Sequence, residues 1–182
     1  EILIKTANSD ETLLPDGEWM TNNAPDDGNG NAINGYRFNP NFGAGLVDAD
    51  AAVSEAMHWK NMGPQISASK STPRFATQQN ITDPEDINWQ AYEVNFDFLR
   101  NVDPRLRVEH ATVSLELEHA YRDDLLIALI PPSGTVSRLV EPSTDRNANY
   151  KNWTFSTVQF WGERNIVNED GTIEGDGQNG RW

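Results

Sequence analysis

Three histidines, His58, His110 and His119, are the candidate general bases of this chain. A hydrolase of the acyl-transfer type pairs such a base with a serine, which in many enzymes sits in a tight Gly-x-Ser-x-Gly turn. None of the three histidines lies beside a serine in a turn of that kind. His58 ends an expected helix, where a positive charge favours the helix dipole, whereas His110 lies within an expected strand and His119 at its polar end. We therefore interpret all three as surface or core residues.

Acidic residues near the C-terminus are the candidate metal ligands. Asp170 and Asp176 each precede a glycine and offer carboxylate oxygens in a turn, so a calcium site there is a hypothesis. Asp26, Asp27 and Asn29 offer similar oxygens, but their spacing lacks the ordered ligands and terminal glutamate of an EF-hand loop. A solvated loop is the favoured interpretation of this second group.

The adjacent carboxylates Asp123 and Asp124 could form an acid and base pair like that of a glycoside hydrolase. They stand between Arg122 and an apolar run, however, which is a position that favours turn capping or pairing with the arginine. We expect a structural role for both.

Charge and composition exclude several classes of partner and site. Lys and Arg total 14 against 28 Asp and Glu, and the net charge of -14 argues against nucleic acid and anionic membranes. Without cysteine, the chain has no disulfide, thiol nucleophile or cysteine-ligated zinc site. No apolar run approaches the ~18 residues of a membrane span. A hydrophobic content of 37%, with abundant Asn, Asp, Gly and Pro, favours a loop-rich β protein.

A β-domain is predicted at residues 108–161. Apolar and polar residues alternate over 113–117, which is typical of a strand that is buried on one face. Residues 125–130 are apolar throughout, so we expect a central strand covered on both faces. After a Pro- and Gly-containing turn, 135–140 can return as a hairpin partner. The aromatic and β-branched run 153–161 predicts a fourth strand.

A helix and long loops are expected before this β-domain. Residues 42–59 contain Gly43 and Gly45, which permit a close backbone approach, and Asp48, a good N-cap. The apolar residues of the helix are expected on one buried face: Ala52, Val53, Ala56 and Met57. The other expected elements are a helix end or buried segment at 1–7, loops at 10–34 and 162–180, an interdomain connection at 61–73 and a strand at 93–99.

A family resemblance rests on the order and spacing of several runs. VEHATVSLELEHAYRDDLLIALIPPSGTVSRL (108–139), NWTFSTVQFWGE (152–163) and GRW (180–182) resemble the P domain, or Homo B domain, of kexin- and furin-like subtilases. The resemblance implies a non-catalytic jelly-roll β-sandwich that packs on the protease and supports its folding. It also implies a strand that begins at the GRW segment, so the domain would be truncated at its C-terminal end.

The residues before the β-domain resemble the end of a subtilase catalytic domain. FGAGLVDA (42–49) is similar to the motif that opens the terminal helix there, Trp59 matches an aromatic residue at the end of that helix, and EWMTNNA (18–24) resembles a segment upstream. The expected organisation is a remnant of an α/β subtilisin-like domain at 1–63 and a P domain at 64–182. The fold class is therefore expected to be mainly β, with a terminal helix and loops in front.

The resemblance implies the C-terminal part of a serine endopeptidase. A subtilase needs an Asp, His and Ser triad and an oxyanion donor, which the resemblance places upstream of residue 1, and the G-T-S nucleophile motif is absent from this chain. We thus predict no catalytic or cofactor-binding residue here. The implied partners are the rest of the catalytic domain and a peptide or protein substrate, cleaved after basic residues. Calcium and a secreted or extracytoplasmic location are family expectations.

Two other functions stay open at this point. A stand-alone jelly-roll module could bind a glycan or a protein through exposed aromatic residues and calcium-binding loops, and a structural spacer is a third reading. The first sixty residues distinguish them, because the helix at 42–59 must dock on a catalytic domain only if the chain belongs to a protease.

Overall fold

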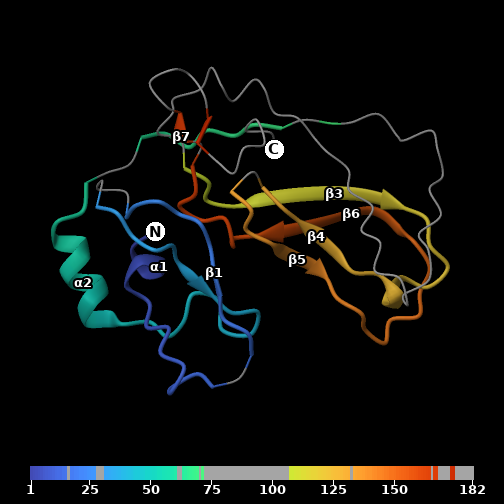
Figure 1. Cartoon of the computed structure of the whole chain (residues 1–182), viewed down its shortest axis with the longest axis horizontal. Coiled ribbons are helices and arrows are strands. Elements are labelled where there is room, and N and C mark those ends of the chain that lie inside the picture. The colour runs from blue at the N-terminus through green and yellow to red at the C-terminus, as the bar shows by residue number, and fades with distance from the viewer. Residues whose placement is uncertain are drawn as a thin grey trace.

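The computed structural model describes residues 1–15, 17–27, 31–60, 63–69, 71, 107–131, 133–164, 166–167 and 173–174. These residues are mainly β, as predicted, with few helices (Figure 1). The helices are α1 (Ile2–Thr6), α2 (Ala49–Met57) and the short 3-10 helix η2 (Arg122–Asp124). The strands are β1 (Met20–Thr21), β2 (Arg37–Phe38), β3 (Ala111–Leu117), β4 (Ile127–Leu129), β5 (Ser137–Val140), β6 (Tyr150–Thr157), β7 (Ile166–Val167) and β8 (Ile173–Glu174).

The long antiparallel pair β3–β6 confirms the first predicted strand. Along β3 the side chains alternate between half-buried and exposed, as its sequence pattern requires. Val113 lies opposite Phe155 and Leu115 opposite Trp153, so one face of the pair is aromatic and aliphatic. The register shifts beyond Leu115, where the backbone of Asn152 takes a positive φ of 47°.

The predicted hairpin of 125–130 with 135–140 forms as β4–β5, but its first strand is shorter than predicted and is not covered on both faces. Within the described residues β4 pairs only with β5, and it covers only Ile127–Leu129. Leu125 is buried, whereas Leu126 and Ile130 are exposed, because they lie on either side of this short strand. The hairpin lies beside β6 (Figure 1). The hydroxyl of Ser137 on β5 lies 2.7 Å from that of Thr157 on β6.

The fourth predicted strand is shifted toward the N-terminus. β6 begins at Tyr150 and ends at Thr157, and the chain then turns, with the Trp161 N–H donating to the Val158 carbonyl. Gly162 takes a φ of 82°, which L side chains rarely adopt. This turn buries Phe160 and Trp161 in the core. The aromatic residues that suggested a longer strand therefore lie in a turn and pack in the core.

Helices α1 and α2 pack against each other at the opposite end from β3 and β6 (Figure 1). The Asp48 carboxylate accepts from the Ala51 N–H at 2.9 Å, which confirms the predicted N-cap of α2. Lys5 of α1 pairs with Glu55 of α2 at 3.2 Å and lies over the ring of Trp59. This pairing fixes which face of α2 points toward α1.

The prediction of a buried apolar face on α2 was wrong for this chain. Val53 is 63% exposed and Met57 is 80% exposed, and Ala56 is exposed as well. The face that packs toward α1 carries Glu55 instead. An apolar face at helical spacing is thus present, but the described residues do not cover it.

The loop regions contain short strands that periodicity did not indicate. β1 pairs with β2 inside the predicted loop 10–34 and beyond it, and β7 pairs with β8 inside the predicted loop 162–180. Gly45 makes the predicted close approach, because a Cβ there would meet the Asn8 carbonyl oxygen. Gly43 does not, since a Cβ there would have nothing within 4 Å. The predicted strand at 93–99 and the candidate ligands Asp170 and Asp176 lie outside the described residues. Of the predicted connection at 61–73, residues 63–69 and 71 are described and form no helix or strand. The domain limits at 63 and 64 stay a prediction.

Candidate functional site

The described residues before 60 and after 106 meet in a buried polar contact, which we call the junction. On one side lie residues 22–26 and Tyr36, which flank β1 and β2, and on the other lie Arg107, the β4–β5 turn and residues 157–164, which follow β6. Three polar side chains at its centre are almost fully buried: Asn22 at 3%, Asp26 at 5% and Glu163 at 1% exposure. Buried polar groups are costly unless they are hydrogen-bonded, so their partners decide whether the contact is stable.

Asn22 uses both ends of its amide. Its Nδ2 donates to the carbonyl oxygens of Gln159 and Trp161, both at 2.9 Å. Its Oδ1 accepts from the Tyr36 N–H at 2.8 Å and from the Ala24 N–H at 3.2 Å. An amide has two donor hydrogens and two acceptor lone pairs, so Asn22 is fully satisfied. It links the turn after β6 to the segment that follows β1.

Glu163 places a carboxylate among neutral donors. Its Oε1 accepts from the Asn23 N–H at 3.0 Å and from the Thr135 hydroxyl at 2.5 Å. Its Oε2 accepts from the Ser133 hydroxyl at 2.6 Å. No basic side chain of the described residues pairs with it. The anion is therefore stabilised by three oriented dipoles, and it ties residue 23 to the β4–β5 turn.

Asp26 joins the same contact through two arginines. Its carboxylate pairs with Arg107 and, through Oδ2 at 2.8 Å, with Arg164. Arg107 also donates to the Gly162 carbonyl oxygen at 3.2 Å. The solvated-loop interpretation was therefore wrong for Asp26, whereas Asp27 lies nearer the surface and holds Asn31 at 2.9 Å. Because two cations already compensate Asp26, its charge needs no bound metal.

An aromatic contact lies beside these polar groups. Tyr36 meets Trp161 edge to face, with ring centroids 4.8 Å apart. A Cβ on Gly162 would lie 3.0 Å from Tyr36 Cε2, so glycine permits this approach. Burial, followed by the charge of Asp27, raises the pKa of the Tyr36 phenol to about 12. Tyr36 is thus neutral at physiological pH.

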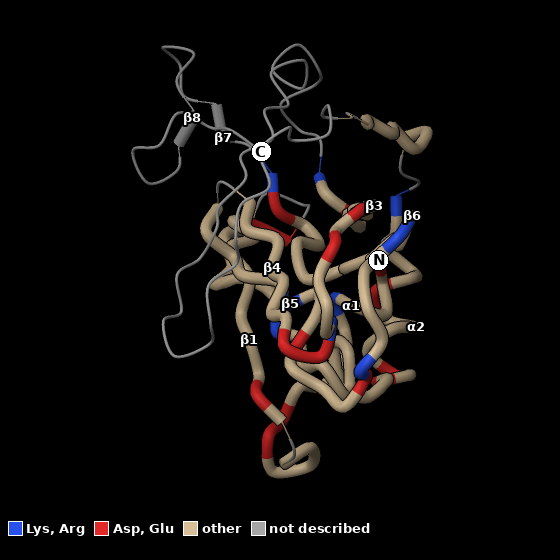
Figure 2. The backbone as a smooth tube through the Cα atoms, turned by 90° about the vertical axis from the view of Figure 1, so that its right-hand side faces the viewer, with Lys and Arg blue, Asp and Glu red and all other residues tan. Residues whose placement is uncertain are grey.

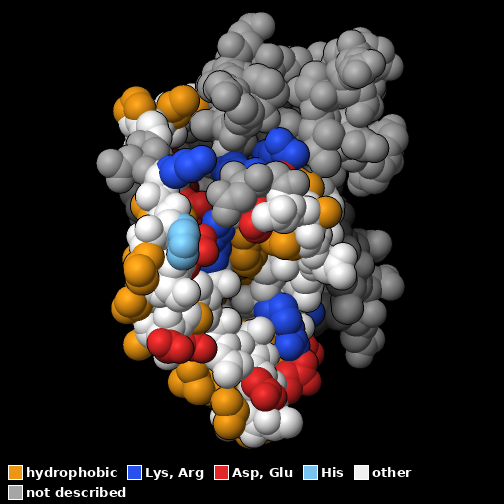
Figure 3. All heavy atoms as spheres, turned by 90° about the vertical axis from the view of Figure 1, so that its left-hand side faces the viewer, with side chains coloured by type: hydrophobic (Ala, Val, Ile, Leu, Met, Phe, Trp, Pro, Cys, Tyr) orange, Lys and Arg blue, Asp and Glu red, His pale blue; other side chains and the backbone are white. Residues whose placement is uncertain are grey.

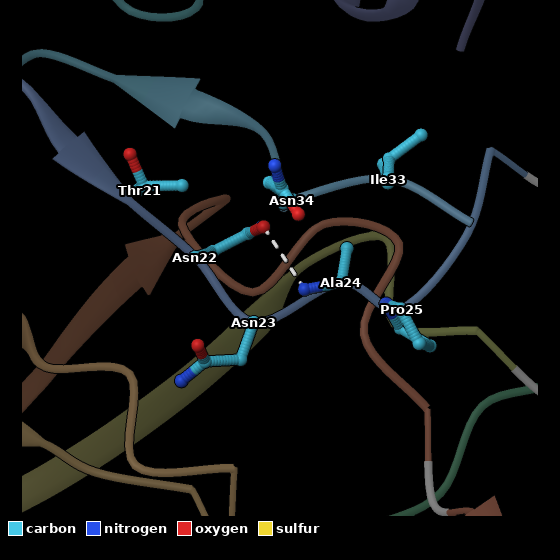
Figure 4. Close-up of a pocket in the computed structure, with 8 residues that line it drawn as sticks. Thr21, Asn22, Asn23, Ala24, Pro25, Ile33 and Asn34 are labelled. Atoms are coloured by element: carbon cyan, nitrogen blue, oxygen red, sulfur yellow. Dashed lines mark hydrogen bonds between the residues drawn. The ribbon is translucent and has the colours of Figure 1, made fainter.

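An open hollow of about 400 Å³ lies on the N-terminal side of the junction (Figure 4). Eight residues line it: Thr21, Asn22, Asn23, Ala24, Pro25, Ile33, Asn34 and Gly35. Its polar groups are amides and a hydroxyl, and no lining side chain is charged or a strong base. The hollow therefore offers hydrogen bonding and no acid–base chemistry.

The predicted chemistry-bearing residues do not converge. His58 ends α2 with its Nδ1 3.0 Å from the Ser54 carbonyl oxygen, and His119 Nδ1 lies 2.6 Å from that of Tyr121. His110 is exposed just before β3. Among the residues with described positions, no three His, Asp or Glu side chains form a group that could hold a metal ion. Asp170 and Asp176, the predicted calcium ligands, are not among those residues, so that site stays a prediction.

Arg122 pairs with Asp145, not with the adjacent aspartates. Its Nε donates to Asp145 Oδ2 at 2.6 Å, and its guanidinium lies 5.4 Å and 5.2 Å from the ring centroids of Tyr150 and Trp153. This hydrogen bond is the main cause of the lowered pKa of the Asp145 carboxyl. The backbone carbonyl of Asp123 accepts from the Ser143 N–H at 3.0 Å. The cluster therefore anchors the loop before β6, which is a structural role.

Sequence reasoning did not identify the junction. Asn22 and Glu163 each lie in a run that carries the family resemblance, 18–24 and 152–163 respectively. That coincidence was the available signal, since neither residue belongs to a periodic apolar pattern. Each residue has a hydrogen-bond partner more than a hundred residues away in the chain: Asn22 donates to the Trp161 carbonyl oxygen, and Glu163 accepts from the Asn23 N–H.

Comparisons with known proteins agree with the family resemblance of these sequence runs. The family described as "Proprotein convertase P-domain" matches residues 108–166. "Protease KEX1" of Kluyveromyces lactis is 27% identical over 161 residues, which are 87% of this chain and 20% of that protein. "Proprotein convertase subtilisin/kexin type 6" of Homo sapiens is 30% identical over 169 residues, 90% of this chain and 16% of that protein.

A third relative is the "Dibasic-processing endoprotease" of Yarrowia lipolytica, 30% identical over 158 residues, 86% of this chain and 16% of that protein. The chain thus spans a fifth or less of the length of these relatives. The alignments extend well beyond residues 108–166 and include the side of the junction before residue 60, because they cover nearly the whole chain. Residues 108–166 are therefore a P domain of the kexin-like proprotein convertase family.

Proposed function

We propose that this chain is the C-terminal part of a kexin-like serine endopeptidase of the subtilisin family, in which the P domain braces the catalytic domain. The observation that carries the proposal is the junction. Asn22 and Glu163 are 3% and 1% exposed, and their hydrogen bonds cross between the two ends of the chain. A contact with buried, fully partnered polar groups is rigid and specific, whereas a flexible tether would expose them to water.

The exposed apolar side of α2 indicates a surface that a further part of the protein would cover. Val53 and Met57 on α2 and Leu3 on α1 are all more than half exposed. Hydrophobic side chains also line one edge of the face on which α2 lies (Figure 3). We infer that the remainder of an α/β subtilisin-like catalytic domain covers this surface. A free binding module would gain nothing from such a helix, so this observation favours the protease over the glycan- or protein-binding alternative.

The activity of the whole protein would be peptide-bond hydrolysis after basic residues. One relative is named a dibasic-processing endoprotease, which supports this specificity. The triad would lie in the catalytic domain, and this chain would supply no catalytic group. Acidic positions occur at several places along the described backbone (Figure 2). The overall charge of -14 would attract a basic substrate at low ionic strength.

A secreted or extracytoplasmic location, a jelly-roll topology and calcium binding belong to the same proposal. The described part of the chain contains no helix with the length and hydropathy of a bilayer span. For calcium, Asp170 and Asp176 are the residues to replace. Chelation should lower the thermal stability of the whole protein, and the double replacement by asparagine should remove any part of that effect due to these residues.

The P domain would brace the catalytic domain because the junction removes apolar surface from contact with water. Burial of apolar surface contributes about 25 cal/mol per Å², and an edge-to-face aromatic pair such as Tyr36 with Trp161 adds about 1 kcal/mol. The P domain would hold residues 22–39 in place, and through them the elements before α2. The catalytic site would then be stabilised from a distance.

The test is to produce the whole protein with and without residues 64–182. We expect the shortened protein to yield little soluble enzyme and to lose activity faster on warming, measured with a fluorogenic peptide that ends in paired basic residues. Equal yield and equal thermal half-life would contradict the bracing role. Residues 1–182 alone should not hydrolyse the peptide, and hydrolysis that a serine-directed inhibitor abolishes would contradict the absence of a catalytic site here.

A further inference from the structure

The dipeptide Asn34–Gly35 at the rim of the hollow is open to a chemical reaction (Figure 4). The Asn34 side chain is exposed to solvent. Within the part of the chain that the structure describes, neither the Asn34 amide nor the Gly35 N–H makes a hydrogen bond. Asparagine followed by glycine is the pair in which the backbone nitrogen reaches the side-chain carbonyl carbon with least hindrance, because glycine has no Cβ. Both reacting groups are therefore free of hydrogen bonds with the described residues.

The reaction needs only water. The deprotonated Gly35 nitrogen attacks Asn34 Cγ and forms a C–N bond, the bond from Cγ to Nδ2 breaks, and ammonia leaves with the proton. The product is a five-membered succinimide. Water then adds to either ring carbonyl and breaks that carbon's bond to the Gly35 nitrogen. One product is aspartate, and the other is isoaspartate, in which the chain runs through the side-chain carbon.

The other described asparagines near the junction lack these features. The Asn22 amide is buried and fully hydrogen-bonded. Asn39 is buried too, and the residue after it is Pro40, which has no N–H to attack. The Asn23 side chain donates to the Ser133 carbonyl oxygen at 2.6 Å. Asn34 thus differs from Asn22, Asn23 and Asn39 in its surroundings and in the residue that follows.

The position of Asn34 links this reaction to the junction. Gly35 lies against Asn22, so closely that a Cβ on Gly35 would be 1.8 Å from the Asn22 carbonyl oxygen. The next residue, Tyr36, donates its N–H to Asn22 Oδ1 and packs on Trp161. Isoaspartate inserts an extra backbone carbon between residues 34 and 35, and it adds a negative charge. Both changes displace Gly35 and Tyr36 from Asn22.

We propose that Asn34 is a site of spontaneous deamidation, and that its isoaspartate product loosens the junction. To test the reaction, the purified chain is incubated folded in mildly alkaline buffer and, in parallel, in urea. Peptide mapping by mass spectrometry follows the amide-to-acid conversion, and an isoaspartyl methyltransferase detects isoaspartate. Mapping also separates Asn34 from the other Asn–Gly pairs, Asn29–Gly30 and Asn179–Gly180.

The expected result is conversion of Asn34 in the folded chain at a rate close to that in urea, while Asn22 and Asn23 stay intact. Conversion in urea with an unchanged Asn34 in the folded chain would overturn the site. Anion exchange then separates the deamidated protein from fresh protein, and mapping gives its isoaspartate content at Asn34. Protein rich in isoaspartate should unfold at a lower temperature than fresh protein. Asn34→Asp carries the charge without the longer backbone, and Asn34→Gln resists cyclisation and should stay stable on ageing. An isoaspartate form as stable as fresh protein would overturn the second part.

Discussion

Replacing Glu163 by glutamine tests whether the hydrogen bonds at the junction outweigh the cost of burying a charge. The side chain is 1% exposed, so water can contribute little to either variant. Glutamine keeps the shape of glutamate. Its oxygen can still accept from the Asn23 N–H and the Thr135 hydroxyl, and its Nε2 can donate to the Ser133 hydroxyl, which rotates to accept. The change thus removes the charge and keeps the contacts.

The magnitude follows from the three hydrogen bonds that Glu163 accepts. A hydrogen bond to a charged group contributes about 1.5–3 kcal/mol net, and a neutral one about 0.5–1.5 kcal/mol. The Ser133 and Thr135 hydroxyls lie at 2.6 and 2.5 Å and should lose most, and the Asn23 N–H at 3.0 Å should lose less. We therefore expect Glu163→Gln to lower the free energy of unfolding by about 2 kcal/mol. Glu163→Ala also leaves buried donors unpaired and should cost about 4 kcal/mol.

The assay is thermal and urea unfolding of the chain, followed by tryptophan fluorescence, since Trp161 is buried at the junction. A loss of 2 kcal/mol corresponds to a fall in Tm of about 4–8 °C for a protein of this size. Glu109→Gln is the matched control. Glu109 is exposed and has no hydrogen bond or ion pair with the described residues, so its Tm should stay unchanged.

A Glu163→Gln variant as stable as the parent chain, or more stable, would refute this reasoning. It would mean that desolvation of the buried carboxylate cancels the charge-assisted hydrogen bonds. An equal loss of stability in Glu163→Gln and Glu163→Ala would also contradict it, because only the alanine variant leaves the buried donors without an acceptor.

Three further predictions use the same unfolding assay. Asn22→Asp removes the two N–H donors and points a carboxylate at two carbonyl oxygens. It should therefore lower the free energy of unfolding by more than about 3 kcal/mol. A Tm equal to that of the parent chain would contradict the described orientation of the amide. Gly43→Ala should lower the free energy of unfolding by about 1–2 kcal/mol, because Gly43 has a φ of 59° and the space around it is open. Gly45→Ala should lower it clearly more, since the added Cβ would also meet Asn8. Equal losses in the two variants would contradict this. The pKa of Tyr36 is raised from 10.0 to about 12, so the folded chain holds this proton more tightly and its stability should fall as the pH rises from 10 toward 12. Tyr36→Phe should make the stability less dependent on pH between 10 and 12, and an unchanged pH dependence would exclude Tyr36 as its cause.

Local patterns identified the elements that local chemistry controls. The alternation at 113–117 predicted β3, and Asp48 predicted the start of α2, because side-chain period and N-capping depend on residues a few positions apart. The Pro and Gly turn before 135–140 predicted the β4–β5 hairpin for the same reason. The family of the β-domain was also readable, since the motifs that mark it are continuous runs of sequence.

Tertiary contacts decided what the patterns could not. The aromatic residues Phe160 and Trp161 look like strand residues, yet they turn into the core, because Gly162 and the Tyr36 ring, more than a hundred residues earlier, shape that turn. The apolar face of α2 predicted burial, but which partner covers a helix is not encoded in its own spacing. The junction itself depends on a carboxylate whose donors are distant in the chain. Hydrogen-bond partners at such separations are set by the fold, and only the three-dimensional structure brings them together.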